Sequence, residues 1–154
     1  MSRASKFFHL SRRDKAILLE ATLSLALARI VMLIAPFRWI ARRMGEQTSP
    51  MKTTDPGERS EQILHLAKIL QAVARNVPWK TNCLVQSIAA ATMLRRRKME
   101  GAVYFGARTD ESGKFEAHAW VCCGEILVTG DHDEEMYTEL AMFRFPKQKK
   151  IGNT

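Results

Sequence analysis

Apolar residues fill the stretch 16–37, where Glu20 and Arg29 are the only charged residues. Ser11, followed three positions later by an acidic residue, resembles a capping box and predicts the start of a helix. Pro36 marks its end, because proline disfavours helical backbone at the preceding residue. Uncharged runs here reach only eight residues, whereas a membrane-spanning helix needs about 20 mostly apolar residues. The pattern therefore predicts a long buried helix, with contact to a membrane surface as the alternative.

Residues 37–44 continue as a short basic helix, which Gly45 can end in a left-handed conformation. The following stretch, 46–57, contains two prolines and several small polar residues, a composition typical of a linker. We interpret residues 1–45 as a helical basic prefix and residues 58–154 as a separate core.

Helical spacing returns after this linker. An Asp-Pro pair, which is a helix-start signal, precedes apolar residues that recur one turn apart and predict a helix over about 57–76. A proline breaks this helix, and a second one follows that extends to about Lys98. Thr81 or Asn82 can cap it, which places Cys83 in its first turn.

Farther along, the apolar residues follow the shorter period of β-strands. The stretches 101–108, 114–123 and 125–131 are rich in β-forming residues and are separated by turn signals. The tail, 132–145, permits a short helix capped by Asp133. Helices first and an antiparallel meander second predict the α+β class.

The composition is that of a folded domain, with 154 residues, 46% hydrophobic and 26% charged. Three cysteines, two of them adjacent, make a poor disulfide framework and fit a reducing compartment. There is no C-x-x-C pair and no Cys/His cluster with zinc-ligand spacing, so we expect neither a metal nor another cofactor. Since no secretory signal is evident, we expect a cytoplasmic protein.

Positive charge is unevenly spread. The net charge is +8, and the first 45 residues hold nine Lys/Arg against two acidic residues. Smaller basic clusters lie at 95–98 and 147–150. Such faces attract nucleic acid, anionic membranes or acidic proteins, although a solvated surface is the simpler interpretation. No groove-reading motif accompanies them. We therefore expect no nucleic-acid binding, and contact of the prefix with a partner protein or, peripherally, with a membrane.

Cys83 is a candidate nucleophile because of its place at a helix start. Unpaired backbone N–H groups and the helix dipole favour a thiolate there, and the same groups can stabilise the oxyanion of an attacked carbonyl. His118 is the candidate general base. The alternative is that Cys83 is a small buried hydrophobic residue. We interpret Cys122 and Cys123, in the middle of the predicted hairpin, as packing residues.

The register of the predicted hairpin suggests the third member of a triad. With 124–125 as a two-residue turn, a glycine at its first central position suits type II′. On that register His118 stands directly opposite Asp131, close enough for the carboxylate to orient the imidazole. Asp133 is the reserve candidate.

Two motifs together resemble a known family. W-x-x-x-C-L at 79–84 and A-H-A-W-V at 117–121 are similar to segments of the stand-alone leader peptidases of lasso-peptide biosynthesis, which are transglutaminase-like cysteine proteases. The resemblance covers roughly residues 18–131. It implies a transglutaminase/papain-like core, in which the nucleophile at a helix N-terminus packs on an antiparallel sheet.

The resemblance also implies roles for Cys83 as nucleophile, His118 as general base and Asp131 as orienting acid. One departure is Cys122, where the family often has glutamate after A-H-A-W-V. No glutamine upstream of the candidate nucleophile is evident that would complete an oxyanion hole, so the sequence leaves the second donor unassigned.

The implied reaction is removal of the leader from a ribosomal precursor peptide through a thioester. The implied partners are a separate leader-recognition protein and an ATP-using, lactam-forming lasso cyclase. Two alternatives remain. One is a transglutaminase-like acyltransferase, in which an amine rather than water resolves the acyl-enzyme. The other is a non-enzymatic binding module that uses the basic face.

Overall fold

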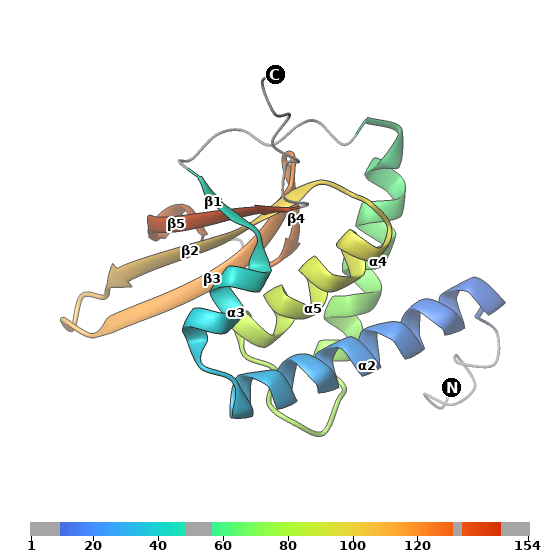
Figure 1. The fold of residues 1–154 in the computed structure, drawn as a ribbon, viewed down its shortest axis with the longest axis horizontal. Helices are drawn as coiled ribbons and strands as arrows, with labels where there is room; N and C mark the ends of the chain where they lie inside the picture. The colour runs from blue at the N-terminus through green and yellow to red at the C-terminus, as the bar shows by residue number, and fades with distance from the viewer. Residues whose placement is uncertain (1–9, 49–56, 131–133, 146–154) are drawn as a thin grey trace, which may run out of the picture.

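The computed structural model describes residues 10–48, 57–130 and 134–145 (Figure 1). Its α-helices are α2 (Arg12–Ile34), α3 (Phe37–Met44), α4 (Ser60–Ala74) and α5 (Cys83–Arg96). Its strands are β1 (Glu46–Thr48), β2 (Gly101–Thr109), β3 (Phe115–Cys123), β4 (Ile126–Thr129) and β5 (Thr138–Phe145). Two short 3-10 helices are η1 (Gly57–Arg59) and η2 (Glu134–Met136).

The described strands form one antiparallel sheet in the order β1-β5-β2-β3-β4. Helices α4 and α5 pack on one face of it, and α2 packs on these two helices, so α5 lies between α2 and the sheet (Figure 1). Apolar side chains from every layer meet in a single core, among them Leu25, Leu66, Ala90, Val121 and Phe145. The predicted α+β class is confirmed.

The limits of α2 follow the predicted signals. Ser11 Oγ accepts a hydrogen bond from the backbone N–H of Asp14 at 3.0 Å. The helix ends at Ile34, because Ala35 is extended ahead of the proline. The Asp14 carboxylate does not close a capping box but lies 2.7 Å from His65 Nε2, which ties the start of α2 to α4.

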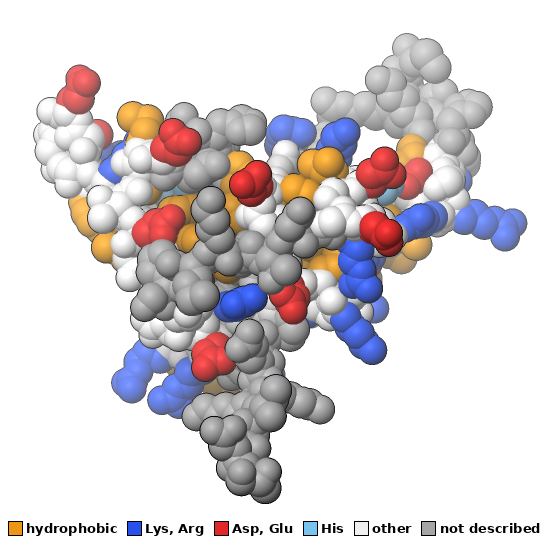
Figure 2. Space-filling model, turned by 90° about the horizontal axis from the view of Figure 1, so that it is seen from above, with side chains coloured by type: hydrophobic (Ala, Val, Ile, Leu, Met, Phe, Trp, Pro, Cys, Tyr) orange, Lys and Arg blue, Asp and Glu red, His pale blue; other side chains and the backbone are white. Residues whose placement is uncertain are grey.

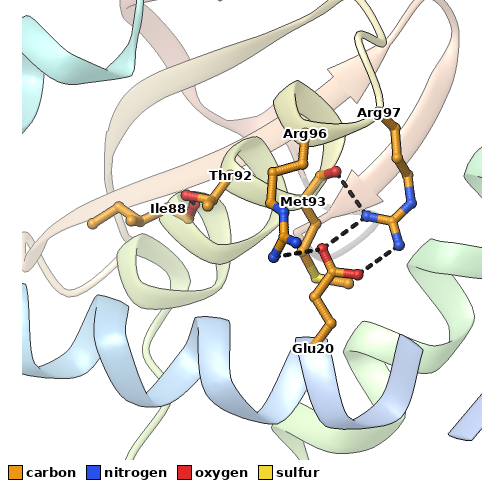
Figure 3. A network of polar contacts seen from close by, with 6 residues as sticks. All are labelled: Glu20, Ile88, Thr92, Met93, Arg96 and Arg97. Atoms are coloured by element: carbon orange, nitrogen blue, oxygen red, sulfur yellow. Dashed lines mark hydrogen bonds and ion pairs between the residues drawn. The ribbon is translucent and has the colours of Figure 1, made fainter. Parts of the chain in front are cut away.

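A carboxylate joins the middle of α2 to the end of α5 (Figure 3). Arg97 donates to the two oxygens of Glu20 at 2.9 and 2.6 Å, and Arg96 Nη1 lies 3.5 Å from the same carboxylate. Arg97 also donates to the carbonyl of Met93 at 2.9 Å. The hydrogen bonds from Arg97 lower the pKa of Glu20, and they outweigh the burial that would raise it. This ion pair fixes the outermost helix to the middle layer.

Gly45 ends α3 differently from the prediction. Its φ of 160° and ψ of −160° are extended rather than left-handed. A Cβ at this position would collide with the carbonyl of Arg144 on β5, so the glycine permits a close approach of the two backbones.

Residues 46–48, predicted as part of a linker, pair with β5 as strand β1. Residues 49–56 lie outside the described residues, and the division into prefix and core stays a prediction.

Two further element predictions were wrong in detail. The helix predicted from residue 57 begins at Ser60, because Gly57 has a positive φ of 53° and starts a 3-10 turn. The tail forms strand β5 rather than a helix beyond η2. β5 lies between β1 and β2 and buries Met142 and Phe145, so backbone pairing on both sides outweighs the local helical signal. Asp133 lies outside the described residues.

Candidate active site

Cys83 is the first residue of α5, as predicted. Asn82 caps the helix with its side-chain oxygen, which accepts from the backbone N–H of Val85 at 2.9 Å. Gln86 donates its backbone N–H to the carbonyl of Asn82 and its side chain to the carbonyl of Thr81, at 3.1 and 2.9 Å. The backbone N–H groups of Cys83 and Leu84, the first two helical residues, therefore make no hydrogen bond within the helix. The half-buried thiol of Cys83 stands beside them.

The segment before α5 holds an unusual buried donor. Trp79 packs against the core, and its Nε1 is buried without a hydrogen-bond partner among the described residues. Buried N–H groups without partners are rare in folded proteins, and each one calls for an explanation. The sequence marked Trp79 only as part of a motif. Its unpaired donor becomes visible only when the surrounding backbone is placed.

His118 lies on β3 within a cluster of aromatic rings. Its ring stacks on Trp120 at a centroid distance of 5.8 Å and lies 5.0 Å from the ring of Tyr137. Trp120 in turn stacks on Tyr104 of β2, at 5.6 Å and nearly parallel. Gly106, the strand partner of His118, makes room for this cluster, since a Cβ there would come within 2.9 Å of Trp120 and of Tyr137. The imidazole is therefore held in one orientation by packing.

The hairpin after His118 confirms the predicted turn but not the whole register. Gly124 has a φ of 58°, as type II′ requires at its first central position, and Cys123 pairs with Ile126. The register then shifts by one residue, and Val121 pairs with Thr129. The bulge removes the basis for placing His118 directly opposite residue 131.

Both predicted acids, Asp131 and Asp133, lie outside the described residues. Without the register argument, the assignment of Asp131 rests on the family resemblance. It stays a prediction, as does the triad as a whole.

The end of β4 links the surroundings of the two described candidates. Ser87, one turn after Cys83 on α5, lies with its Oγ 3.5 Å from Thr129 Oγ1. The next residue, Gly130, packs against His118, and a Cβ added to it would lie 3.6 Å from the imidazole Nε2. Thr129, the last residue of β4, thus contacts the nucleophile helix, and Gly130 just after the strand lies against the imidazole.

The structure does not join Cys83 to His118 by a hydrogen bond. The His118 Nε2 is buried without a partner among the described residues. Side chains alternate along β3, so the imidazole faces the side of the sheet away from Val121, which packs beneath the helices. Described β4 pairs only with the last three residues of β3, so β3 forms the sheet edge at His118. The thiol and the imidazole can therefore meet only around this edge.

The other two cysteines differ from Cys83 in their surroundings. Cys123 is fully buried in the core, and burial raises the pKa of its thiol to about 12, with a further contribution from Cys122. Neither lies at a helix terminus. Within the described ranges, no group of three or more His, Cys, Asp or Glu side chains is placed to hold a metal ion.

Comparison with known proteins identifies the family. Searches of curated proteins and of solved structures returned no match. Residues 25–142 match the transglutaminase-like superfamily, and they contain both motifs and most of the described helices and strands. The α+β fold, with a helix that begins at a cysteine and packs on an antiparallel sheet, is consistent with a transglutaminase-like core. The chain belongs to the transglutaminase-like superfamily, which includes cysteine proteases and acyltransferases.

Proposed function

We propose that this protein is a cytoplasmic cysteine peptidase that removes the leader from a lasso-peptide precursor, with Cys83 as nucleophile, His118 as general base and Asp131 as orienting acid. The observation that carries the proposal is the start of α5. A cysteine stands there beside backbone N–H groups that the Asn82 cap leaves unpaired by the helix. Membership of the superfamily and the motifs at 79–84 and 117–121 support the same assignment.

The proposed reaction proceeds through a thioester. His118 takes the proton of the Cys83 thiol, and the sulfur attacks the carbonyl carbon of the scissile peptide bond. The C–N bond then breaks, and the leaving amine takes the proton back from the imidazolium. Water, deprotonated by the imidazole, attacks the thioester and releases the leader carboxylate and the free thiol. No oxidant, metal or nucleotide enters this sequence.

Donors for the oxyanion are available at the same helix start. The backbone N–H groups of Cys83 and Leu84 lie in the first turn, where the helix makes no bond to them. The indole N–H of Trp79 is a third candidate, because it is buried and unpaired among the described residues. Preorganised donors of this kind stabilise the charge that develops on the carbonyl oxygen.

The edge of the sheet is where the triad would assemble. The helix contacts Thr129 through Ser87, and His118 Nε2 lies against Gly130. Asp131, the proposed orienting acid, follows Gly130 in the sequence. Formation of the triad requires the imidazole to leave its packed position on Trp120 and Tyr137 and to approach the thiol around the edge strand. We propose that substrate binding favours this movement.

The partners proposed for this function are a separate leader-recognition protein and a lasso cyclase that uses ATP. Leader removal produces a new N-terminal amine on the core peptide. A lactam-forming enzyme consumes such an amine, so coupling of the two enzymes would protect the intermediate. The leader-recognition protein would supply the affinity for the precursor.

The test is incubation with a precursor peptide and the leader-recognition protein, followed by mass spectrometry. Wild type should give two fragments, and Cys83→Ala none, while Cys122→Ala serves as the matched half-buried control and keeps its activity. An adduct with an added amine, in place of fragments, would identify an acyltransferase. Cleavage by Cys83→Ala would overturn the assignment of the nucleophile.

Thiol labelling separates a failed assay from a wrong site. Iodoacetamide should modify Cys83 faster than Cys122, and should leave Cys123 unmodified in the folded protein because its thiol is buried and its pKa is raised to about 12. Equal labelling of all three thiols would contradict a special environment at the start of α5.

A further inference from the structure

The outer face of α2 is apolar from Leu19 to the end of the helix. Six large side chains lie along it with half or more of their surface exposed, namely Leu19, Leu23, Leu27, Ile30, Leu33 and Ile34. From Leu19 to Leu33 they are three or four residues apart, and Ile34 follows Ile30 by four, so all six lie on one side of the helix. The opposite side carries the buried residues Ile17, Ala21, Leu25 and Ala28. A helix apolar on all sides is normally buried on all sides, and α2 is not.

The apolar surface continues onto α3. Phe37 is 52% exposed and Trp39 is 46% exposed, and the guanidinium of Arg43 lies 4.6 Å above the Trp39 ring. Arg38 and Arg42 are also exposed on this short helix. Tryptophan flanked by arginine is typical of groups that lie at the level of lipid headgroups. We call the exposed residues of α2 and α3 from Leu19 to Trp39 the apolar face.

Basic groups surround the apolar face, and the acidic residues of α2 are not available to neutralise them. Arg12 and Arg13 are exposed in the first turn of α2, and the arginines of α3 follow its last turn. The two acidic residues of α2 are both engaged, Asp14 by His65 and Glu20 by Arg97. The side opposite α2 differs, because acidic and basic side chains are mixed across it (Figure 2). The charge around the apolar face therefore complements an anionic surface.

The shape of the face argues for a lipid surface over a partner helix. A groove of about 520 Å³ runs between α2 and α5, lined by Leu23, Leu27 and Ile88 among others. Ile30, Leu33 and Ile34 do not line it, so a helix seated in the groove would leave these exposed. A membrane surface would cover the whole face at once.

α2 is long and apolar enough to cross a membrane by length and composition. Its other side packs on α4 and α5, however, so crossing would require the core to open. We propose that the apolar face lies on the surface of an anionic membrane, with the leucines of α2 among the outer acyl carbons and the arginines at the phosphates. The binding orients the molecule with α2 toward the lipid and the sheet away from it (Figure 1).

Co-sedimentation of the full chain with vesicles tests this proposal. One vesicle is phosphatidylcholine alone, and the other is equal parts phosphatidylcholine and phosphatidylglycerol. We expect binding to the anionic vesicle and weak binding to the neutral one. Leu27→Gln combined with Ile30→Gln should lower the binding constant by about tenfold or more, since two exposed apolar side chains no longer enter the lipid.

The matched control is Leu140→Gln on β5, which is 66% exposed but lies outside the apolar face, and it should bind as wild type does. Arg38→Glu with Arg42→Glu should also reduce binding and its dependence on salt. Circular dichroism checks that each variant is folded. Absence of binding to anionic vesicles would overturn the proposal. So would self-association without lipid that Leu27→Gln abolishes, since the face would then be a protein interface.

Discussion

The two ends of α5 differ in how completely their polar groups are paired. At the C-terminal end, Arg97 binds Glu20, and Arg95 donates to the carbonyl of Arg43 at 2.6 Å while it lies 5.3 Å from the centroid of the Phe145 ring. Near the N-terminal end, Trp79 Nε1 is buried without a partner among the described residues.

We interpret the paired C-terminal end of α5 as structural and the N-terminal end as the place of the chemistry. A completed ion-pair network holds elements together, and its loss is measured as stability. Unpaired donors in a packed surrounding cost stability, and a protein retains them where they act on something else. The basic run at the end of α5, which by sequence could have been a binding patch, is largely engaged within the molecule. The following predictions test the contrast.

The largest effect is expected in the proposed triad. Asp131→Asn should lower kcat by about 10⁴-fold with little change in Tm, because a triad acid orients the imidazole and selects its tautomer, as in serine proteases. Asp133→Asn is the matched control and should have a mild effect. Steady-state cleavage of the precursor and a thermal melt give the two readouts. The reverse ranking of the two variants would assign the acid to residue 133.

The next effect concerns the unpaired indole. Trp79→Phe removes the N–H, and kcat should fall by about 10²- to 10³-fold while KM changes little, since an oxyanion donor acts mainly in the transition state. Trp39→Phe, a tryptophan at an exposed position on α3, should leave kcat unchanged. A rise in KM with an unaltered kcat would instead indicate that Trp79 contacts bound substrate.

The smallest effect belongs to the paired end and appears in stability alone. Glu20→Gln should lower the free energy of unfolding by about 2 kcal/mol, because the Arg97 guanidinium loses its charged partner. Arg96→Gln should cost less than about 1 kcal/mol, since its side chain is 69% exposed and its bond is long. Urea unfolding measures both. A loss of activity per folded molecule in Glu20→Gln would break the contrast between the two ends.

The same pair gives a pH signature. The pKa of Glu20 is lowered in the folded state. Its contribution to the free energy of unfolding is therefore complete above the ordinary glutamate pKa of about 4.3, and it is lost as the pH falls through the lower folded value. The stability difference between wild type and Glu20→Gln should therefore shrink on acidification. A constant difference down to about pH 2 would contradict an ionised Glu20 as the partner of Arg97.

Local signals predicted much of the fold. The cap at Ser11, the cap at Asn82 and the turn at Gly124 each depend on neighbours in sequence. The first and the third were predicted, and Asn82 was one of two predicted caps beside Thr81. Gly45 was predicted to end a helix, but its reason for being glycine is the carbonyl of a strand about a hundred positions away. Strand β5 likewise depends on its partners β1 and β2.

The candidate site shows the same limit. The position of Cys83 at a helix start follows from local sequence and was predicted correctly. The register shift between Val121 and Cys122 was not, because a bulge is set by how the sheet packs and leaves no mark in the hydrophobic pattern. Trp79 Nε1 lacks a partner among the described residues, and this depends on the placement of the surrounding atoms, so no single-sequence argument could have found it.

The ion pair of Glu20 and Arg97 also has a consequence for synthesis of the chain. The two residues are 77 positions apart, so at translation rates of about 5–20 residues per second α2 waits roughly 4–15 s for the residue that fixes it. Until α4 and α5 have been made, both sides of α2 are uncovered, the one that packs on these helices and the one that stays exposed. α2 is thus made several seconds before the residue that fixes it, and during that time its apolar side chains are accessible to a chaperone or to a nearby bilayer.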